Sequence, residues 1–279
     1  MLSYIFKRLL MIVPVIFGVA FIIFAIMSMT PGDPAMMILG EGARPEQYEA
    51  LREQMGLNDP FLVRYVRYVW NALHGDFGRS YRTNLPVFQE IATRIPYTVS
   101  MAVFSTVIAV ALGLPIGILS AVKQYSLSEN VALGVSLLLT AMPTFWLAMM
   151  LVLLFSLRWR LLPSLGAETW SHFILPSIAT AASTMAALLR MTRSTMLEVI
   201  RQDYIRTARA KGARESRVIF RHALQNALLP VVTVIGVNFG VTLGGTIVVE
   251  QVFAIPGLGQ LIINAIRSRD TPMVVASVI

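Results

Sequence analysis

Long apolar stretches without charge dominate the sequence. Five of them contain no Asp, Glu, Lys, Arg or His and approach or exceed the roughly 20 residues that a helix needs to cross a bilayer. These stretches are residues 9–29, 97–122, 131–157, 173–189 and 228–249. The pattern therefore predicts five membrane-spanning helices, of which the fourth is short and can extend back through Ser171.

A sixth apolar stretch begins at Thr271 and covers nine residues, up to Ile279. It supplies about 14 Å of helix, less than half of a hydrocarbon core of roughly 30 Å. We therefore expect the natural product to continue for about 20–30 residues, enough to complete a sixth span and a short tail. Intact-mass measurement of the natively expressed protein checks this expectation.

The first span is expected to stay on the protein as an anchor. Its apolar run exceeds that of a signal peptide, and no small-residue cleavage site follows it. Lys7 and Arg8 precede it, and the alternation of spans places residues 123–130 and 190–227 on the same side. That side holds twelve basic and four acidic residues, whereas the other holds eleven of each. Because short cytoplasmic loops are rich in Lys and Arg, we predict a cytoplasmic N-terminus.

The segment between the first two spans, residues 31–96, has helical patterns of its own. Asp59 is typical of an N-cap, and Pro60 of a first helical residue. The apolar faces of these helices are expected to lie on the membrane surface or on a partner protein. Three helices are predicted: from Pro45 to Gly56, from Pro60 to His74, and over residues 87–94, before Pro96.

Composition agrees with a membrane protein, since 56% of the residues are hydrophobic and only 14% are charged. A soluble domain is nearer half apolar and a quarter charged. The net charge of +8 lies entirely on the predicted cytoplasmic face, so it reflects topology and gives no reason to expect a nucleic acid partner. The chain has no cysteine, which excludes disulfides, thiolate metal sites and thiol catalysis.

Enzymatic motifs are missing from the sequence. The histidines His74, His172 and His222 stand alone in loops or at span ends, which makes a poor metal site. No nucleophile elbow, HExxH motif or Walker phosphate loop occurs. Since the spans hold no charged residue, an ion-coupled carrier is disfavoured, and any transport must draw its energy from elsewhere.

Within the spans, small and polar residues suit helix packing. Gly113 with Gly117, and Gly240 with Gly244, allow close helix contact. Pro115 and Pro143 are compatible with kinks but are also tolerated by packing. The Ser, Thr and amide side chains fit packing better than substrate binding. The candidates to line a pathway are Met142, Phe145 and Asn238.

The cytoplasmic segment 190–227 has more pattern than a connector needs. A short helix over residues 203–213 is predicted to break at Gly212, because glycine tolerates positive φ, and a second helix over residues 215–227 ends before Pro230. Small residues at Ala208, Ala210 and Ala213 would allow another protein to approach closely, with basic side chains around them. The alternative is a basic loop that sets topology or meets anionic lipid headgroups.

The predicted docking surface consists of consecutive residues around this glycine. They are Tyr204, Ile205, Arg206, Thr207, Ala208, Arg209, Ala210, Lys211, Gly212 and Ala213.

The same segment resembles the coupling loop of ABC importer permeases, and most closely their dipeptide/oligopeptide/nickel branch. The resemblance starts from Tyr204-Ile-Arg-Thr-Ala-Arg-Ala-Lys-Gly212 and Arg221-His-Ala-Leu-Gln-Asn-Ala-Leu-Leu-Pro230. Further blocks agree in order along the whole chain, among them Pro31-Gly-Asp-Pro34, His74-Gly-Asp-Phe-Gly-Arg-Ser80, Glu250-Gln-Val-Phe253 and Pro256-Gly-Leu-Gly259. The chain departs from the broad permease motif where Arg206, Thr207 and Ala208 replace a Glu-Ala-Ala triplet, so the acidic anchor of that motif is missing.

The resemblance implies an all-α, polytopic membrane helix bundle with the type I ABC importer permease (MetI-like) fold, here with five full spans and the start of a sixth. It divides the chain into an N-terminal anchor span (1–30), an extracytoplasmic helical segment (31–96) and a permease core (97–279) that carries the coupling loop 190–227. The implied location is the cytoplasmic (inner) membrane of a bacterium or archaeon.

The resemblance also implies partners. These are a second permease subunit in a heterodimer, two ATP-binding subunits at the cytoplasmic loops, an extracytoplasmic solute-binding protein, and membrane lipid. ATP and Mg would be used by the ATP-binding subunits, so this subunit is expected to be non-catalytic and to bind no cofactor. The first expected substrate is a di- or oligopeptide, and glutathione and chelated nickel are the alternatives in the same family. A membrane scaffold or channel that works without ATP is the alternative of another class.

Overall fold

The computed structural model describes residues 2–30, 32–40 and 42–279, so Met1, Glu41 and Pro31, which opens the Pro31-Gly-Asp-Pro34 block, lie outside the described residues. The described residues are helical apart from loops and one isolated β-bridge between Arg79 and Pro86. The α-helices are α1 (Leu2–Met29), α2 (Pro34–Leu39), α3 (Pro45–Gln54), α4 (Phe61–Leu73), α5 (Val87–Val122), α6 (Leu127–Ala141), α7 (Thr144–Leu151), α8 (Ile174–Ile200), α9 (Asp203–Ala210), α10 (Glu215–Arg217), α11 (Leu224–Gly245), α12 (Ile247–Val252), α13 (Leu258–Arg267) and α14 (Thr271–Val278). Short π-helical segments occupy Val152–Arg158 and Val218–Ala223, and a 3-10 turn occupies Trp170–Phe173.

The all-α fold class is confirmed. Among the described residues, four helical segments are long and apolar enough to cross a membrane, and a fifth joins them if the bent pair α6 and α7 counts as one span. With the bent pair counted as one span, the total of five agrees with the five predicted spans. The chain forms two compact units, the N-terminal unit (residues 1–96 and 260–279) and the central unit (residues 97–259). That the anchor, extracytoplasmic and core segments act as functional units stays a prediction.

The predicted break between a helix over residues 87–94 and the second span is wrong, because α5 runs unbroken from Val87 to Val122. Pro96 lies inside this helix. An internal proline removes one backbone hydrogen bond, a loss that the 36 residues of continuous helix outweigh. The border between the two compact units falls directly after Pro96.

The predicted third span, 131–157, is not one straight helix, because α6 and the helix beginning with α7 meet at an angle of 103°. The break lies at Met142, whose ψ of 128° is extended. Proline at position 143 explains this, because its ring disfavours the helical conformation for the residue before it. Pro143 is therefore a true break point.

The fourth and fifth spans also differ from their predicted ends. α8 continues through Ile200, so the first part of the predicted loop 190–227 is helix. The predicted second helix of that loop does not end before Pro230, since α11 begins at Leu224 and includes this proline. The fifth span, predicted to reach residue 249, ends at Gly245, and α12 follows it.

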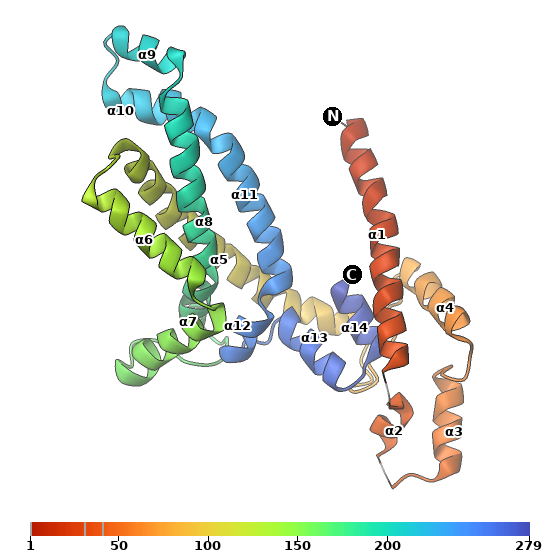
Figure 1. Cartoon of the computed structure of the whole chain (residues 1–279). Coiled ribbons are helices and arrows are strands. Elements are labelled where there is room, and N and C mark those ends of the chain that lie inside the picture. Colours follow the sequence, from red (N-terminus) through yellow and green to blue (C-terminus); the bar gives the residue numbers. More distant parts are fainter. Residues whose placement is uncertain (1, 31, 41) are drawn as a thin grey trace. The chain divides into compact units, whose positions relative to one another are not determined.

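In the N-terminal unit, α4 and α14 pack against the C-terminal half of α1 (Figure 1). Aromatic rings form the contact: Phe21 meets Phe61 and Tyr65 edge-to-face, with centroids 5.5 and 5.1 Å apart. The Tyr65 hydroxyl donates to the Phe17 carbonyl at 2.8 Å. The buried Val275 brings α14 into the same cluster. The last nine residues thus contribute a helix to this unit.

The helices predicted after α1 form with small shifts. α3 starts at Pro45 as predicted. α4 starts at Phe61, one residue later than predicted, because Pro60 keeps an extended ψ of 143°. Asp59 does not cap α4; its carboxylate instead pairs with Arg67 at 2.7 Å.

In the central unit, α8 lies between α6 and α11 (Figure 1). The predicted close contact at Gly113 and Gly117 is confirmed. A Cβ at Gly113 would come within 2.8 Å of the Met185 carbonyl, and one at Gly117 within 2.8 Å of the Leu189 carbonyl. α5 therefore packs on α8 at a distance that larger residues would prevent. Gly240 and Gly244, in contrast, have no described atom within 4 Å of an added Cβ.

Candidate functional site

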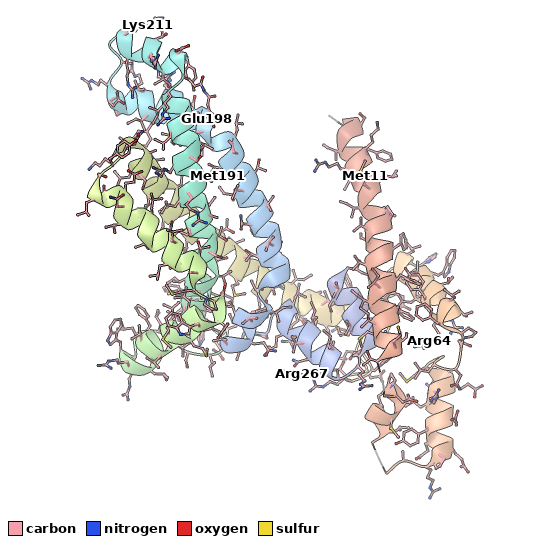
Figure 2. All side chains as sticks on the ribbon, viewed as in Figure 1. Met11, Arg64, Met191, Glu198, Lys211 and Arg267 are labelled. Atoms are coloured by element: carbon pink, nitrogen blue, oxygen red, sulfur yellow. The ribbon has the colours of Figure 1, made fainter. Side chains whose placement is uncertain are left out.

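The segment predicted to dock a partner forms a helical elbow. α9 ends at Ala210, Gly212 turns the chain with φ of 77°, and α10 leads back through π-helical turns into α11. The positive φ predicted for Gly212 is confirmed. Its N–H donates to the Arg209 carbonyl at 2.9 Å, which closes the turn, and Lys211 lies at its tip (Figure 2).

The elbow is packed onto the helices that lead into it. Ile205 is completely buried, in a cluster with Ile118 of α5, Met196 of α8 and Val218. Across the turn, the Arg209 guanidinium pairs with Glu215 at 2.6 Å. These contacts give the elbow a defined shape of its own.

The ten predicted docking residues do not share one surface. Ile205 is buried, and Ala208 and Ala213 are half-buried against the same cluster, so of the three expected small residues Ala210 alone is exposed. The reason is that Ile205 is the one large aliphatic residue of α9, and its burial turns Ala208 inward as well, since residues three apart share a helix face. The exposed members are Tyr204, Arg206, Thr207, Arg209, Ala210, Lys211 and Gly212.

Two arginines bind α8 to α6, and both lie in the part of α8 beyond the predicted end of the fourth span, residues 190–200. The Arg193 Nε donates to the buried Glu129 carboxylate at 2.7 Å, and Arg190 donates to the Thr140 hydroxyl at 2.9 Å. Glu129 also accepts from the backbone N–H of Tyr125. The part of α8 between the span and the elbow is thus braced by charge-assisted hydrogen bonds.

A cavity of about 410 Å³ lies in the central unit between α7, α8, α11 and α12. Two of the three predicted pathway residues, Phe145 and Asn238, line it together; Met142 does not, and lies at the break after α6. The Asn238 amide donates to the Val234 carbonyl at 2.8 Å within its own helix. The other lining residues are Thr144, Thr180, Ser183, Thr184, Val241, Thr242, Thr246, Val248 and Val249.

The hydroxyl-rich character of this cavity is new information from the structure. None of its described lining residues is charged, and the buried Thr180 hydroxyl has no hydrogen-bond partner in the part of the chain that the structure describes. In the sequence these Ser and Thr residues lie on separate spans, so no local signal marks them as one site. Among the described residues, no cluster of His, Asp or Glu side chains could hold a metal ion.

Glu250 is a second residue whose role no sequence pattern revealed. Its carboxylate is fully buried and accepts hydrogen bonds from the hydroxyls of Thr98, at 2.8 Å, and Thr246, at 3.0 Å. Thr98 in turn accepts from the Leu258 N–H at 2.8 Å. This network holds α12 and the following turn to the start of the second span. The motif Glu250-Gln-Val-Phe253 contains the acid, but its partner Thr98 lies 152 residues away in the sequence.

Comparisons with known proteins agree with this architecture. The chain matches the family described as binding-protein-dependent transport system inner membrane component over residues 113–279, and the N-terminal part of such membrane components over residues 1–102. It is 40% identical to the dipeptide transport system permease protein DppB and to the glutathione transport system permease protein GsiC, both of Escherichia coli K12. Each comparison covers 100% of this chain, together with 92% of DppB and 91% of GsiC.

A solved structure shares the fold. The inward-facing MetNI methionine ABC transporter matches with a TM-score of 0.54 and 20% identity, over 68% of this chain and 90% of that chain. The predicted MetI-like fold is thereby confirmed, and the family models and the two permeases confirm the family resemblance seen in the sequence motifs. The chain therefore belongs to the inner membrane components of binding-protein-dependent transport systems, the permeases of ABC importers.

Proposed function

We propose that this chain is one permease subunit of an ATP-driven importer of di- or oligopeptides in the cytoplasmic membrane. The observation that carries the proposal is the uncharged, hydroxyl-lined cavity between α7, α8, α11 and α12. Hydroxyl and amide groups can exchange hydrogen bonds with peptide groups, whose donors and acceptors need partners once they leave water. The 40% identity to a dipeptide permease supports the same substrate class.

The subunit is proposed to couple this cavity to ATP-binding subunits through the elbow. Thr184 lines the cavity, and α8 continues from there to Ile200, beside the elbow. The intervening helix is about 24 Å long at 1.5 Å per residue. Because α8 is braced by Glu129 and packed on the buried Ile205, a displacement of the elbow would move the cavity wall.

The other partners follow from the family. We propose a second permease subunit against α11, whose Val237 and Val241 are exposed and whose Gly240 has open space beside it. An extracytoplasmic binding protein would deliver the substrate. ATP and Mg would be bound by the ATP-binding subunits, and this chain would be non-catalytic, with its N-terminus in the cytoplasm.

Glutathione is the second candidate substrate, because the chain is equally similar to a glutathione permease. Chelated nickel is less well supported, because the cavity offers hydroxyls and one amide but no His or carboxylate among its described lining residues.

Uptake measurements in the native host test the proposal. A strain without this subunit is complemented with the wild-type chain, and uptake of a labelled neutral dipeptide, glutathione and nickel is compared. Dipeptide uptake that requires the chain, and co-purification of ATP-binding subunits with it, is the expected result. If the chain restored only glutathione or nickel uptake, that compound would be the substrate in place of a peptide. If the chain purified without an ATP-binding subunit, the result would favour the ATP-independent scaffold or channel.

A cavity variant sharpens the same test. Asn238→Leu removes the one amide of the cavity and is expected to lower dipeptide uptake roughly tenfold, the effect of losing about one hydrogen bond. Thr233→Val is the matched control, since Thr233 lies on the same helix, is exposed and does not line the cavity. Equal dipeptide uptake by the Asn238→Leu and Thr233→Val variants would show that the cavity is not part of the transport pathway.

A further inference from the structure

Helix α4 of the N-terminal unit has three different faces. Phe61, Tyr65 and Tyr68 pack on the aromatic residues of α1. A second face is apolar and uncovered, with Leu62, Val66, Trp70 and Leu73 each between 62% and 66% exposed. The spacing of these four residues places them on one stripe along the helix. The third face, with Arg64, Arg67 and Asn71, lines a cavity.

This cavity is strongly basic. Its volume is about 720 Å³, and four arginines line it: Arg64, Arg67, Arg79 and Arg82. None of its described lining residues is acidic. Arg67 pairs with Asp59, but no carboxylate of the described residues lies within ion-pair distance of the other three. The cavity therefore presents an excess of positive charge and guanidinium donors without a matching anion.

Two tyrosines add hydroxyl groups to the same cavity. The Tyr68 hydroxyl is buried and has no hydrogen-bond partner among the described residues. Burial raises the pKa of Tyr81 to about 12, so its hydroxyl stays protonated and can donate. A ligand with several oxygen acceptors would satisfy these donors. Guanidinium groups pair with the oxygens of phosphate in bidentate geometry, which favours a phosphate group.

The cavity lies at the end of a membrane span. The Arg64 guanidinium stands over the Phe24 ring, 5.6 Å from its centroid. Phe24 is five residues before Met29, where α1 ends, so Arg64 lies about 8 Å along the axis from that end. Arginine side chains this close to a span end extend to the headgroup region, whereas an apolar stripe that contains Trp suits the boundary between headgroups and acyl chains. In Figure 2, Arg64 lies beside the C-terminal half of α1.

We propose that α4 is an interfacial helix that inserts its apolar stripe into the leaflet at the C-terminal end of α1, and that the arginine-lined cavity binds the phosphate of an anionic phospholipid. Charge complementarity of the cavity and the apolar stripe on another face of α4 both select a lipid. An acidic protein partner would match the arginines, but nothing in its charge would account for the four large apolar side chains on another face of the same helix. A free phosphate would match the cavity alone.

Lipid affinity tests the cavity. The purified protein is placed in nanodiscs of phosphatidylcholine, with and without phosphatidylglycerol, and retained lipid is counted by native mass spectrometry. Each arginine near an anionic surface is worth about fivefold in affinity, so Arg79→Gln with Arg82→Gln should weaken phosphatidylglycerol retention roughly ten- to thirtyfold. The control pair, Arg44→Gln with Arg267→Gln, removes the same charge from exposed residues outside the cavity and should change little.

Three results would overturn the proposal. If both double variants retained phosphatidylglycerol equally poorly, the effect would come from net charge and not from the cavity. If the wild-type protein showed no preference for phosphatidylglycerol, the cavity would not be a site for anionic lipid. Inorganic phosphate that displaces the retained lipid at millimolar concentration would point to a free anion as the ligand.

Because the chain has no cysteine, a spin label can test the stripe independently. A label at Val66→Cys should be accessible to oxygen and protected from a water-soluble nickel reagent. A label at Glu49→Cys, an exposed residue of α3, should show the opposite behaviour. Water-like accessibility at both positions would show that α4 stays outside the bilayer. The measurement reads only this helix, so it is independent of whether the subunit imports a peptide.

Discussion

Glu250 illustrates how one buried side chain can organise a membrane protein. Its carboxylate accepts from Thr98 and Thr246, and the chain packs around it so closely that a Cβ on Gly257 would come within 2.4 Å of the Glu250 Cδ. The Glu250 side chain therefore leaves room only for glycine at position 257. A buried polar group costs little only while its partners are in place, which makes the network sensitive to the loss of any member.

Glu250→Ala is expected to destabilise the protein by about 2–5 kcal/mol, because two buried hydroxyls lose their acceptor and a small cavity is left. The apparent melting temperature of the detergent-solubilised protein should fall by roughly 5–15 °C. Gln251→Ala changes the exposed neighbour and serves as the control. Equal melting temperatures for the two variants would show that the network carries no stability.

At the scale of elements, the elbow combines a local signal with a tertiary one. Gly212 adopts a φ of 77°, which its sequence position suggested, while the buried Ile205 decides which side of α9 can face a partner. Ala208 is consequently a poor place to test docking, since Ala208→Glu would disturb the elbow itself. Gly212 is exposed, and an added Cβ would meet no described atom within 4 Å, so its backbone can be tested without a steric clash.

Gly212→Pro is expected to abolish transport while membrane insertion continues. Proline fixes φ near −65° and removes the N–H that donates to Arg209. Gly212→Asn is the matched variant and should retain uptake within about twofold, because Asn tolerates the left-handed region. Uptake and co-purification of ATP-binding subunits are measured at equal expression. Wild-type uptake by the proline variant would show that the shape of the elbow is not needed for coupling to the ATP-binding subunits.

At the scale of the whole molecule, the predicted topology separates the charge by side of the membrane. The predicted cytoplasmic segments carry twelve basic and four acidic residues, and the elbow lies among them. Coupling to an ATP-binding subunit requires the elbow to face the cytoplasm, so the proposed function depends on this topology. Lipid binding by the arginine-lined cavity of the N-terminal unit does not require the elbow to face the cytoplasm.

Cysteine labelling in intact cells measures the topology. A cysteine at Glu46, an exposed residue of α3, should react with an impermeant thiol reagent, and one at Ser216 in α10 should react only after lysis. The chain has no native cysteine, so background labelling of it is absent. The reverse pattern would place the elbow outside the cell and exclude docking of an ATP-binding subunit.

The spans, the positive φ of Gly212 and the family were all accessible from the printed residues, and so was the prediction of which side of the membrane carries the charge. Each of these depends on neighbours in the chain: apolar length decides insertion, local charge decides orientation, and glycine decides the turn. The close contact at Gly113 and Gly117 was predictable for a similar reason, since small residues four apart form one groove on a helix.

Other features required the packed molecule. The 103° angle between α6 and α7, at a proline that the sequence left open as a kink, the continuation of α8 to Ile200 and the partial burial of Ala208 are not specified by periodicity. The partners of Glu250 include Thr98, which lies 152 residues away, and the cavity joins hydroxyls from three helices and from Thr246, between α11 and α12. Such contacts depend on how helices pack across long separations in sequence, and hydrophobic periodicity specifies which face of a helix is apolar but not which neighbour will cover it.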